Sequence, residues 1–293
     1  MASLKDIRKR ISTVRSTQQI TKAMKMVAAA KLRRAQEAVT AARPYATKLT
    51  ELLRGVAGTL PDDAHPLLRS TPEPARIRLL VLTSDRGLCG AYNSALLRQA
   101  QAFLRGQKGR ETSVSIVGRK AADYFRRRQV AIADRFGQTP TPAVALAREI
   151  AAKLVTEFKE GKVDRVEILY SLFRSALSQV PTIEPLLPLS VETKPSAEEE
   201  AKAASATTEY LMEPDQASLL DRLLPQVVEL RIYRALLEAA ASEHGARMTA
   251  MDSATSNASK MIFSLTLAMN RARQAAITKE LMEIVSGAEA LKG

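Results

Sequence analysis

The sequence predicts an α/β protein in which long N- and C-terminal helices form an antiparallel coiled coil, with a domain of mainly parallel sheet inserted between them. Residues 1–43 contain neither Gly nor Pro, so no residue there interrupts a helix. No Pro follows Pro225, and no Gly lies between Gly245 and Gly287. Between these two regions, short apolar runs alternate with helical patterns, which is typical of a parallel sheet covered by helices.

The first 34 residues have the pattern of a basic amphipathic helix. They hold ten Lys or Arg residues and one acid, Asp6, which gives +9 of the chain's net charge of +13. Apolar residues recur first at heptad spacing and then as a shifted stripe, at Leu4, Ile7, Ile11, Val14, Ile20, Met24 and Val27. Pro44 is expected to kink this helix rather than end it, because residues 45–53 favour helix. We therefore predict a coiled-coil helix over residues 1–60.

The C-terminal region also has the pattern of a long helix with an apolar stripe. Asp215 and Ser218 provide start signals for a helix near residue 216. Further along, apolar residues recur at steps of three and four, at Ala258, Met261, Ile262, Leu265, Ala268, Met269, Ala272 and Ala276. Two helices of a globular bundle would be the alternative, but long periodicity without caps favours the extended form. We predict that residues 209–293 pair with the N-terminal helix.

The central region alternates between strand and helix patterns. A Pro-rich linker is predicted over residues 61–75, and a polar connector over residues 191–208. Buried strands are expected over residues 76–83, 113–117, 130–134 and 163–173, and a further strand over 179–183 pairs through a hairpin. Helices are expected over residues 91–104, 119–128 and 143–159. This order predicts a Rossmann-like α/β domain over residues 76–190.

Composition excludes several kinds of site. A single Cys allows neither an intrachain disulfide nor a Cys-rich zinc site, and His65 and His244 add too few ligands for a mixed metal cluster. No apolar run approaches the ~20 residues that a membrane helix needs. The N-terminus has no apolar signal core. We therefore expect a soluble intracellular protein without direct membrane insertion.

The junction after the first predicted strand is the place to look for a nucleotide site. Gly87 and Gly90 make a G-x-x-G, which lacks the three glycines of a dinucleotide fingerprint. Gly161-Lys162-Val163 does not complete a Walker motif. Cys89 could act as a nucleophile at a helix N-terminus, but no catalytic constellation accompanies it. We interpret this segment as a tight turn around a small buried residue, and we expect no catalytic residue, cofactor or metal.

The net charge of +13 suggests a polyanionic partner, which could be nucleic acid, an anionic membrane surface or an acidic protein. Aromatic residues make up 4% of the chain and Trp is absent, so few platforms exist for base stacking. The basic positions alternate with an apolar seam that must pack inside the protein, which favours an acidic protein surface. A basic helical nucleic-acid-binding module is the alternative, and it predicts duplex binding with a steep salt dependence.

Three separated segments of the chain stand out as motifs. They are Ile7–Gln36, with ITKAMKMVAAAKLRRAQ at its end, then Ser84–Asn93, with SDRGLCG, and Arg247–Ala288, with RQA, IT, EIV and GA. These segments resemble motifs of one family, the gamma subunit of F-type ATP synthases. They occur in the family's order and span essentially the whole chain. The resemblance implies a central rotor shaft without catalytic activity or cofactor. Its terminal helices would enter a hexamer of alpha and beta subunits, and its α/β domain would lie with the epsilon subunit on the membrane ring of c subunits.

The resemblance also implies contact residues. Contacts to a catch loop of the beta subunit are matched by Arg273, Gln274 and Thr278, and coupling positions by Met24, Arg247 and Glu283. The foot that approaches the c-ring loops is matched by Glu209, Tyr210 and Met212, although an aromatic residue is often found at the last position. Charge and helix position further predict basic residues that face acidic lever segments of the beta subunits: Arg8, Lys9, Lys22, Lys25, Arg33 and Arg34.

Two features of the sequence indicate the type of organism and membrane in which the protein is expected. Chloroplast members of the family carry a regulatory cysteine pair, which one Cys cannot supply. The chain begins without a transit peptide. We therefore expect a peripheral subunit on the cytoplasmic face of a bacterial plasma (inner) membrane.

Overall fold

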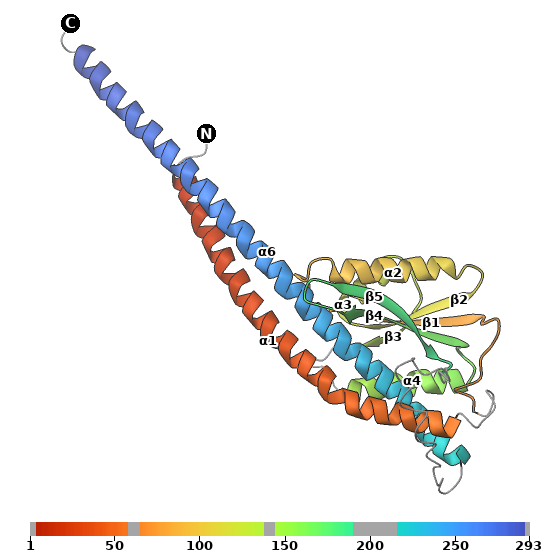
Figure 1. The fold of residues 1–293 in the computed structure, drawn as a ribbon. Helices are drawn as coiled ribbons and strands as arrows, with labels where there is room; N and C mark the ends of the chain where they lie inside the picture. The colour runs from red at the N-terminus through yellow and green to blue at the C-terminus, as the bar shows by residue number, and fades with distance from the viewer. Residues whose placement is uncertain (1–3, 58–64, 138–143, 190–215, 291–293) are drawn as a thin grey trace. The chain divides into compact units, whose positions relative to one another are not determined.

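The structure is a computed structural model that describes residues 4–57, 65–137, 144–189 and 216–290. The chain forms two compact units, residues 1–28 with 247–293, and residues 29–246. The division falls inside two long helices, α1 (Leu4–Ala57) and α6 (Gln216–Ala290), which are drawn in Figure 1. The predicted connector over residues 191–208 lies outside the described residues.

Both terminal helices are continuous, as the sequence predicts. α1 includes Pro44 and α6 includes Pro225, so neither proline ends its helix. Each proline removes one backbone hydrogen bond, and the surrounding Ala and Leu residues, which are strong helix formers, favour helix on both sides of it.

The second unit contains a five-stranded sheet in the order β3-β2-β1-β4-β5. Its strands are β1 (Arg76–Leu82), β2 (Glu111–Val117), β3 (Ile132–Phe136), β4 (Arg165–Phe173) and β5 (Gln179–Leu187). The first four strands are parallel, and β5 pairs with β4 in an antiparallel hairpin. The predicted mainly parallel sheet and its hairpin are therefore confirmed.

Helices cover both faces of this sheet (Figure 1). They are α2 (Tyr92–Gly106) and α3 (Arg119–Arg126) on one face and α4 (Val144–Lys159) on the other. The side chains of β1 alternate between them: Leu79 and Val81 pack in the cluster with α2 and α3, and Leu80 and Leu82 in the cluster with α4. Burial on both faces explains why β1 has a continuous apolar sequence instead of an alternating one.

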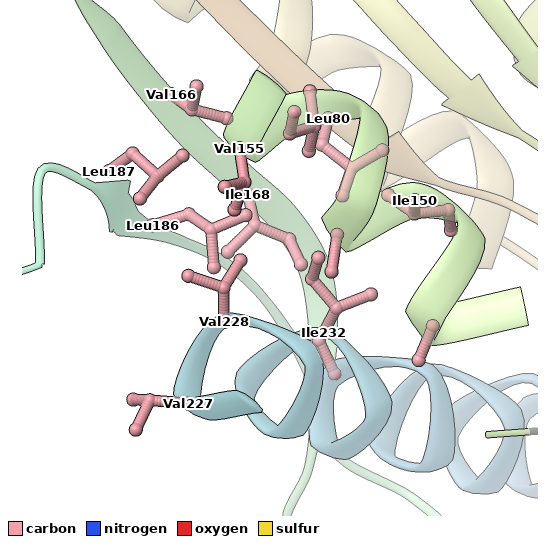
Figure 2. Packing of buried hydrophobic residues seen from close by; sticks show 14 of the residues in the cluster. Leu80, Ile150, Val155, Val166, Ile168, Leu186, Leu187, Val227, Val228 and Ile232 are labelled. Carbon is pink, nitrogen blue, oxygen red and sulfur yellow. The ribbon is translucent and has the colours of Figure 1, made fainter. Parts of the chain in front are cut away.

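The face covered by α4 also carries parts of both long helices. Val228 and Ile232 of α6 point toward the side chains of β4, β5 and α4 (Figure 2). Leu49 of α1 belongs to the same buried cluster. Leu67 and Leu68, inside the predicted linker over residues 61–75, are buried there as well, because two apolar side chains between the prolines can join the core.

Asp164 joins the start of β4 to the start of β1. Its carboxylate accepts hydrogen bonds from the backbone N–H groups of Ala75 (3.0 Å) and Arg76 (2.8 Å) and from Nη2 of Arg76 (2.7 Å). The Arg76 guanidinium, followed by these backbone donors, holds the pKa of the Asp164 carboxyl below its usual value of 3.8. The ionised form of Asp164 therefore stabilises the junction of β1 and β4.

We expect Asp164→Asn to lower the free energy of unfolding by about 1–2 kcal/mol at neutral pH, because the charge-assisted bonds to Arg76 are lost. A lowered pKa means that the native contribution is present above the unfolded value of 3.8 and is lost as the pH falls below it. The difference between the two proteins should therefore shrink from pH 7 toward pH 3. Urea unfolding across that range measures it, with Glu73→Gln, an exposed carboxylate nearby, as the matched control. A difference that is constant with pH would contradict this role.

Candidate functional site

The first unit is an antiparallel pair of helices formed by the start of α1 and the end of α6 (Figure 1). On α1 the buried and half-buried residues follow steps of three and four: Ile7, Ile11, Val14, Gln18, Thr21, Lys25 and Ala28. On α6 they are Met251, Thr255, Ala258, Ile262, Leu265, Met269, Ala272 and Ala276, together with a few flanking positions. This strict heptad seam confirms the predicted antiparallel coiled coil.

The predicted course of the seam on α1 is wrong after Val14. Ile20 and Val27 were expected within it, but they are 59% and 57% exposed. The heptad instead continues one residue later, through Gln18, Thr21 and Lys25, which have hydrogen-bonding partners on α6. On α6, Met261 and Ala268 were also expected in the stripe and are exposed. Apolar character alone did not identify the seam, because part of the seam is polar.

Three polar pairs connect the helices at these positions. Gln18 Nε2 donates to Ser259 Oγ at 2.7 Å, and the Thr21 and Thr255 hydroxyls share a hydrogen bond of 2.8 Å. Lys25 Nζ donates to Asp252 Oδ1 at 2.5 Å. We call these six residues the polar ladder. In every pair the two residue numbers add to 276 or 277, which defines the register of the seam.

That register places Leu4, the first described residue of α1, opposite residues 272–273 of α6. Helix α6 continues to Ala290, so residues 277–290, called here the α6 tip, extend past the start of α1 (Figure 1). Five apolar side chains of the tip are between 49% and 68% exposed: Ile277, Leu281, Met282, Ile284 and Val285. A concentration of exposed apolar residues is typical of a surface that another protein covers.

The predicted catch-loop residues lie together where the paired segment of α6 ends and the tip begins. Arg273, Gln274 and Thr278 are exposed, and the Thr278 hydroxyl donates to the Gln274 carbonyl at 3.0 Å. Glu283 is also exposed and forms an ion pair of 3.6 Å with Lys279.

The remaining predicted coupling and foot residues are not gathered with these. Met24 and Arg247 are half-buried toward the other end of the paired segment. Glu209, Tyr210 and Met212 lie outside the described residues.

The six predicted lever-facing basic residues have different surroundings. Arg8, Lys9 and Lys22 are exposed on α1 in the first unit. Lys25 is bound to Asp252 in the polar ladder. Arg33 and Arg34 are exposed in the second unit, where Arg33 also forms an ion pair of 3.0 Å with Glu37.

The Ser84–Asn93 segment is a turn held by its own side chains. Asn93 Oδ1 accepts from the Ser84 backbone N–H at 3.1 Å, and Asn93 Nδ2 donates to the Cys89 sulfur at 3.1 Å. Cys89 is 2% exposed, which confirms that it is a small buried residue in a turn. These contacts are structural and leave the Cys89 sulfur inside the core.

A close backbone approach occurs at Gly118 and not at Gly87. Gly90 has a positive φ of 56°, but the atom nearest to an added Cβ at Gly87 is 4.0 Å away. A Cβ at Gly118 would lie 2.2 Å from the Thr83 carbonyl oxygen, and its φ is 93°. β1 and β2 end side by side at this point, where the Thr83 N–H donates to Val117 O at 2.9 Å, so only glycine fits after β2.

Buried polar groups in the second unit bind one another. Arg78 donates to Ser113 and Ser115 on β2 and to Asp134 on β3, at 2.7, 3.1 and 3.0 Å. This cluster was not identified from the sequence, because an arginine in an apolar strand gives no local sign of its partners. His65 is 5% exposed and hydrogen-bonds to Asp221 at 3.0 Å.

In the part of the chain that the structure describes, no group of three or more His, Cys, Asp or Glu residues is arranged to hold a metal ion. Within the same ranges, no helix combines the length and apolar character needed to cross a membrane.

The fold and the exposed tip define a class of protein: a coiled-coil shaft with an α/β domain inserted between its two helices. The family described as ATP synthase matches residues 3–291. ATP synthase gamma chains from Moorella thermoacetica and Geobacter metallireducens are 49% and 50% identical to it, with all of this chain and all of each relative aligned. The chain therefore belongs to the ATP synthase gamma-chain family.

Solved structures show the same fold. A mitochondrial ATP synthase structure from Tetrahymena thermophila, described as central stalk and c-ring, contains a chain that is 27% identical, with a TM-score of 0.61 over 80% of this chain and 99% of that one. A chain in the rotor of the Euglena gracilis mitochondrial ATP synthase is 20% identical, with a TM-score of 0.66 over 94% of this chain and 98% of that one. The fold of this chain is thus that of chains found in the central stalk and rotor of solved ATP synthases.

The seam assignment predicts unequal effects for two isoleucines of α1. Ile11 is 7% exposed and Ile20 is 59% exposed. Ile11→Ala should lower the opening free energy of residues 4–28 by about 2 kcal/mol, since it leaves a cavity between the helices. Ile20→Ala should change it by less than about 0.5 kcal/mol. Backbone hydrogen exchange in this segment measures both, and equal effects would show that the seam is misassigned.

Proposed function

We propose that this chain is the central rotor shaft of its ATP synthase, coupling ion-driven rotation of the membrane c-ring to conformational change at the catalytic sites of the beta subunits. In this account ATP synthesis and its reversal take place on the beta subunits. We assign the shaft to residues 1–60 and 209–293 and the α/β body to residues 76–190, with residues 61–75 and 191–208 as the connections.

The observation that carries the proposal is the exposed α6 tip. Its five large apolar side chains have no residue of α1 opposite them in the described chain. The tip is 14 residues long, or roughly 21 Å at the helical rise. Leaving this much apolar surface in water is unfavourable, so a partner that encloses the tip is the simplest explanation. A sleeve formed by the alpha and beta subunits is such a partner.

The helices also suit the transmission of torque. α6 contains no Gly between Gly245 and Gly287 and no Pro after Pro225, so its backbone hydrogen bonds are uninterrupted along the paired segment and the tip. α1 is paired with it through the heptad seam. Two helices that are bonded along their length resist twisting better than one helix alone.

The exposed polar residues supply the proposed contacts with the beta subunits. Arg273, Gln274 and Thr278, where the paired segment of α6 ends and the tip begins, would hydrogen-bond to a catch loop, and Met24, Arg247 and Glu283 would affect coupling. Exposed cations on α1, such as Arg8, Lys9 and Lys22, would attract acidic lever segments, with a strength that salt screens. Arg33 and Arg34 extend this basic surface along α1.

The remaining partners follow from the same proposal. The α/β domain would contact the epsilon subunit, and the foot at Glu209, Tyr210 and Met212 would approach the c-ring loops. The chain would not itself be catalytic, would need no cofactor and would not bind nucleic acid. It would be a peripheral subunit on the cytoplasmic face of the bacterial inner membrane, attached through the complex.

The double variant Arg273→Ala with Gln274→Ala tests the catch contact. We expect proton-coupled ATP synthesis in membrane vesicles to fall by roughly tenfold, which corresponds to the loss of one or two good hydrogen bonds to a partner. Because both side chains are exposed, the helicity of the isolated chain should not change.

The matched control is Ser256→Ala with Lys260→Ala, which also removes one polar and one basic exposed side chain from α6. It should retain most of the synthesis activity. Wild-type synthesis in the Arg273 and Gln274 variant would remove these residues from the coupling surface. Equal losses in both variants would indicate a general effect of helix charge.

A further inference from the structure

The N-terminal helix contains a second apolar stripe that lies mostly outside the seam. Ile20, Met24 and Val27 each lie one residue before a position of the observed seam, and Thr17 precedes them in the same row; of the three apolar residues, only Met24 is half-buried. Rotating this part of α1 by one residue, about 100°, would move the stripe to face α6. Ile20 and Val27 would gain burial in that arrangement, since they are more than half exposed in the observed one, and this gain competes with the observed seam.

The observed setting instead presents Gln18, Thr21 and Lys25 to α6. Each has a complementary group at the matching position: a hydroxyl for the Gln18 amide, a hydroxyl for the Thr21 hydroxyl, and a carboxylate for the Lys25 amine. All three pairs have short donor–acceptor distances, from 2.5 to 2.8 Å. In the rotated setting all three would be lost together.

We propose that the polar ladder fixes the rotational setting of α1 against α6 and thereby keeps Ile20 and Val27 on the outer surface. Polar residues in a coiled-coil seam are known to select one arrangement over others at some cost in stability. A single exposed polar pair contributes little to the stability of the helix pair, because water competes for its hydrogen bonds. Three successive pairs act together, and they oppose the burial of two large apolar side chains.

This setting determines which residues of α1 a surrounding partner meets. Ile20 and Val27, seven residues apart in one row of the helix, form an apolar strip on the outer side. Its importance for coupling rests on the proposed function, but the rotational setting itself is a property of the chain alone. The experiment below therefore uses the isolated full-length chain, so its failure would leave the rotor proposal untouched.

Thiol labelling at two positions reports the setting in opposite directions. Thr17 is exposed and would turn toward α6 in the rotated arrangement, while Ala28 is 1% exposed and would turn away from it. Thr17→Cys and Ala28→Cys are made separately in a Cys89→Ser background, because Cys89 is the chain's one native thiol. The rate of reaction with a maleimide is measured for each full-length chain.

The ladder is then deleted by Gln18→Ala, Thr21→Ala and Lys25→Ala. We expect the labelling rate to fall at Thr17→Cys and to rise at Ala28→Cys, each by roughly fivefold or more, since each interhelix hydrogen bond shifts such an equilibrium by a factor of about five. Adding Ile20→Ala and Val27→Ala removes the competing stripe and should restore both rates. The matched control, Thr13→Ala with Gln19→Ala and Lys22→Ala, removes the same residue types from exposed positions and should change neither rate.

Two results would overturn the proposal. Unchanged rates in the ladder-deleted chain would show that the apolar part of the seam fixes the setting by itself. Faster labelling at both positions would show that the helices separate, so that the ladder only adds adhesion. Opposite changes that Ile20→Ala and Val27→Ala fail to reverse would also contradict the role assigned to the competing stripe.

Discussion

Antiparallel pairing of α1 with α6 is the interaction on which the first compact unit depends. An isolated helix with a narrow apolar stripe is marginal in water, and here each stripe is buried by the other helix through Ile7 and Ile11 on α1 and Met251 and Ala258 on α6. The apolar layers supply adhesion and the polar ladder supplies register. The same pairing explains what remains exposed, because the part of α6 that has no α1 residue opposite it is the apolar tip.

In the second unit, burial on both faces of the sheet has the corresponding role. β1 is central, between β2 and β4, and its side chains enter both apolar clusters. The helices that cover the sheet leave no room for a charged side chain without partners, which explains why Arg78 is bound to Ser113, Ser115 and Asp134. In a similar way, the ion pair between Asp164 and Arg76 stabilises the start of β1. These polar side chains of the second unit thus stabilise its fold.

The sequence predicted the secondary structure well where burial gives a simple pattern. β1 and β4 are largely apolar, and the long helices lack glycine over long stretches, so each could be identified from local signals. It failed where a long-range contact decides the outcome. Ile20 and Val27 have the spacing of seam residues. The seam instead runs through Gln18, Thr21 and Lys25, because these residues pair with polar residues of α6: Ser259, Thr255 and Asp252.

The candidate site was predictable to a similar extent. Exposed residues just before the tip, such as Arg273 and Gln274, were identified by resemblance to a family and lie where a partner can reach them. Lys25 was grouped with the outward cations by charge and helix position, and the structure pairs it with Asp252.

Direct observation of rotation tests the central claim. With the catalytic hexamer immobilised and a bead attached at Lys108→Cys, an exposed position of the α/β domain, ATP should drive rotation of the bead in one direction. Sustained ATP hydrolysis with a stationary bead would contradict the proposal that this chain is the rotor.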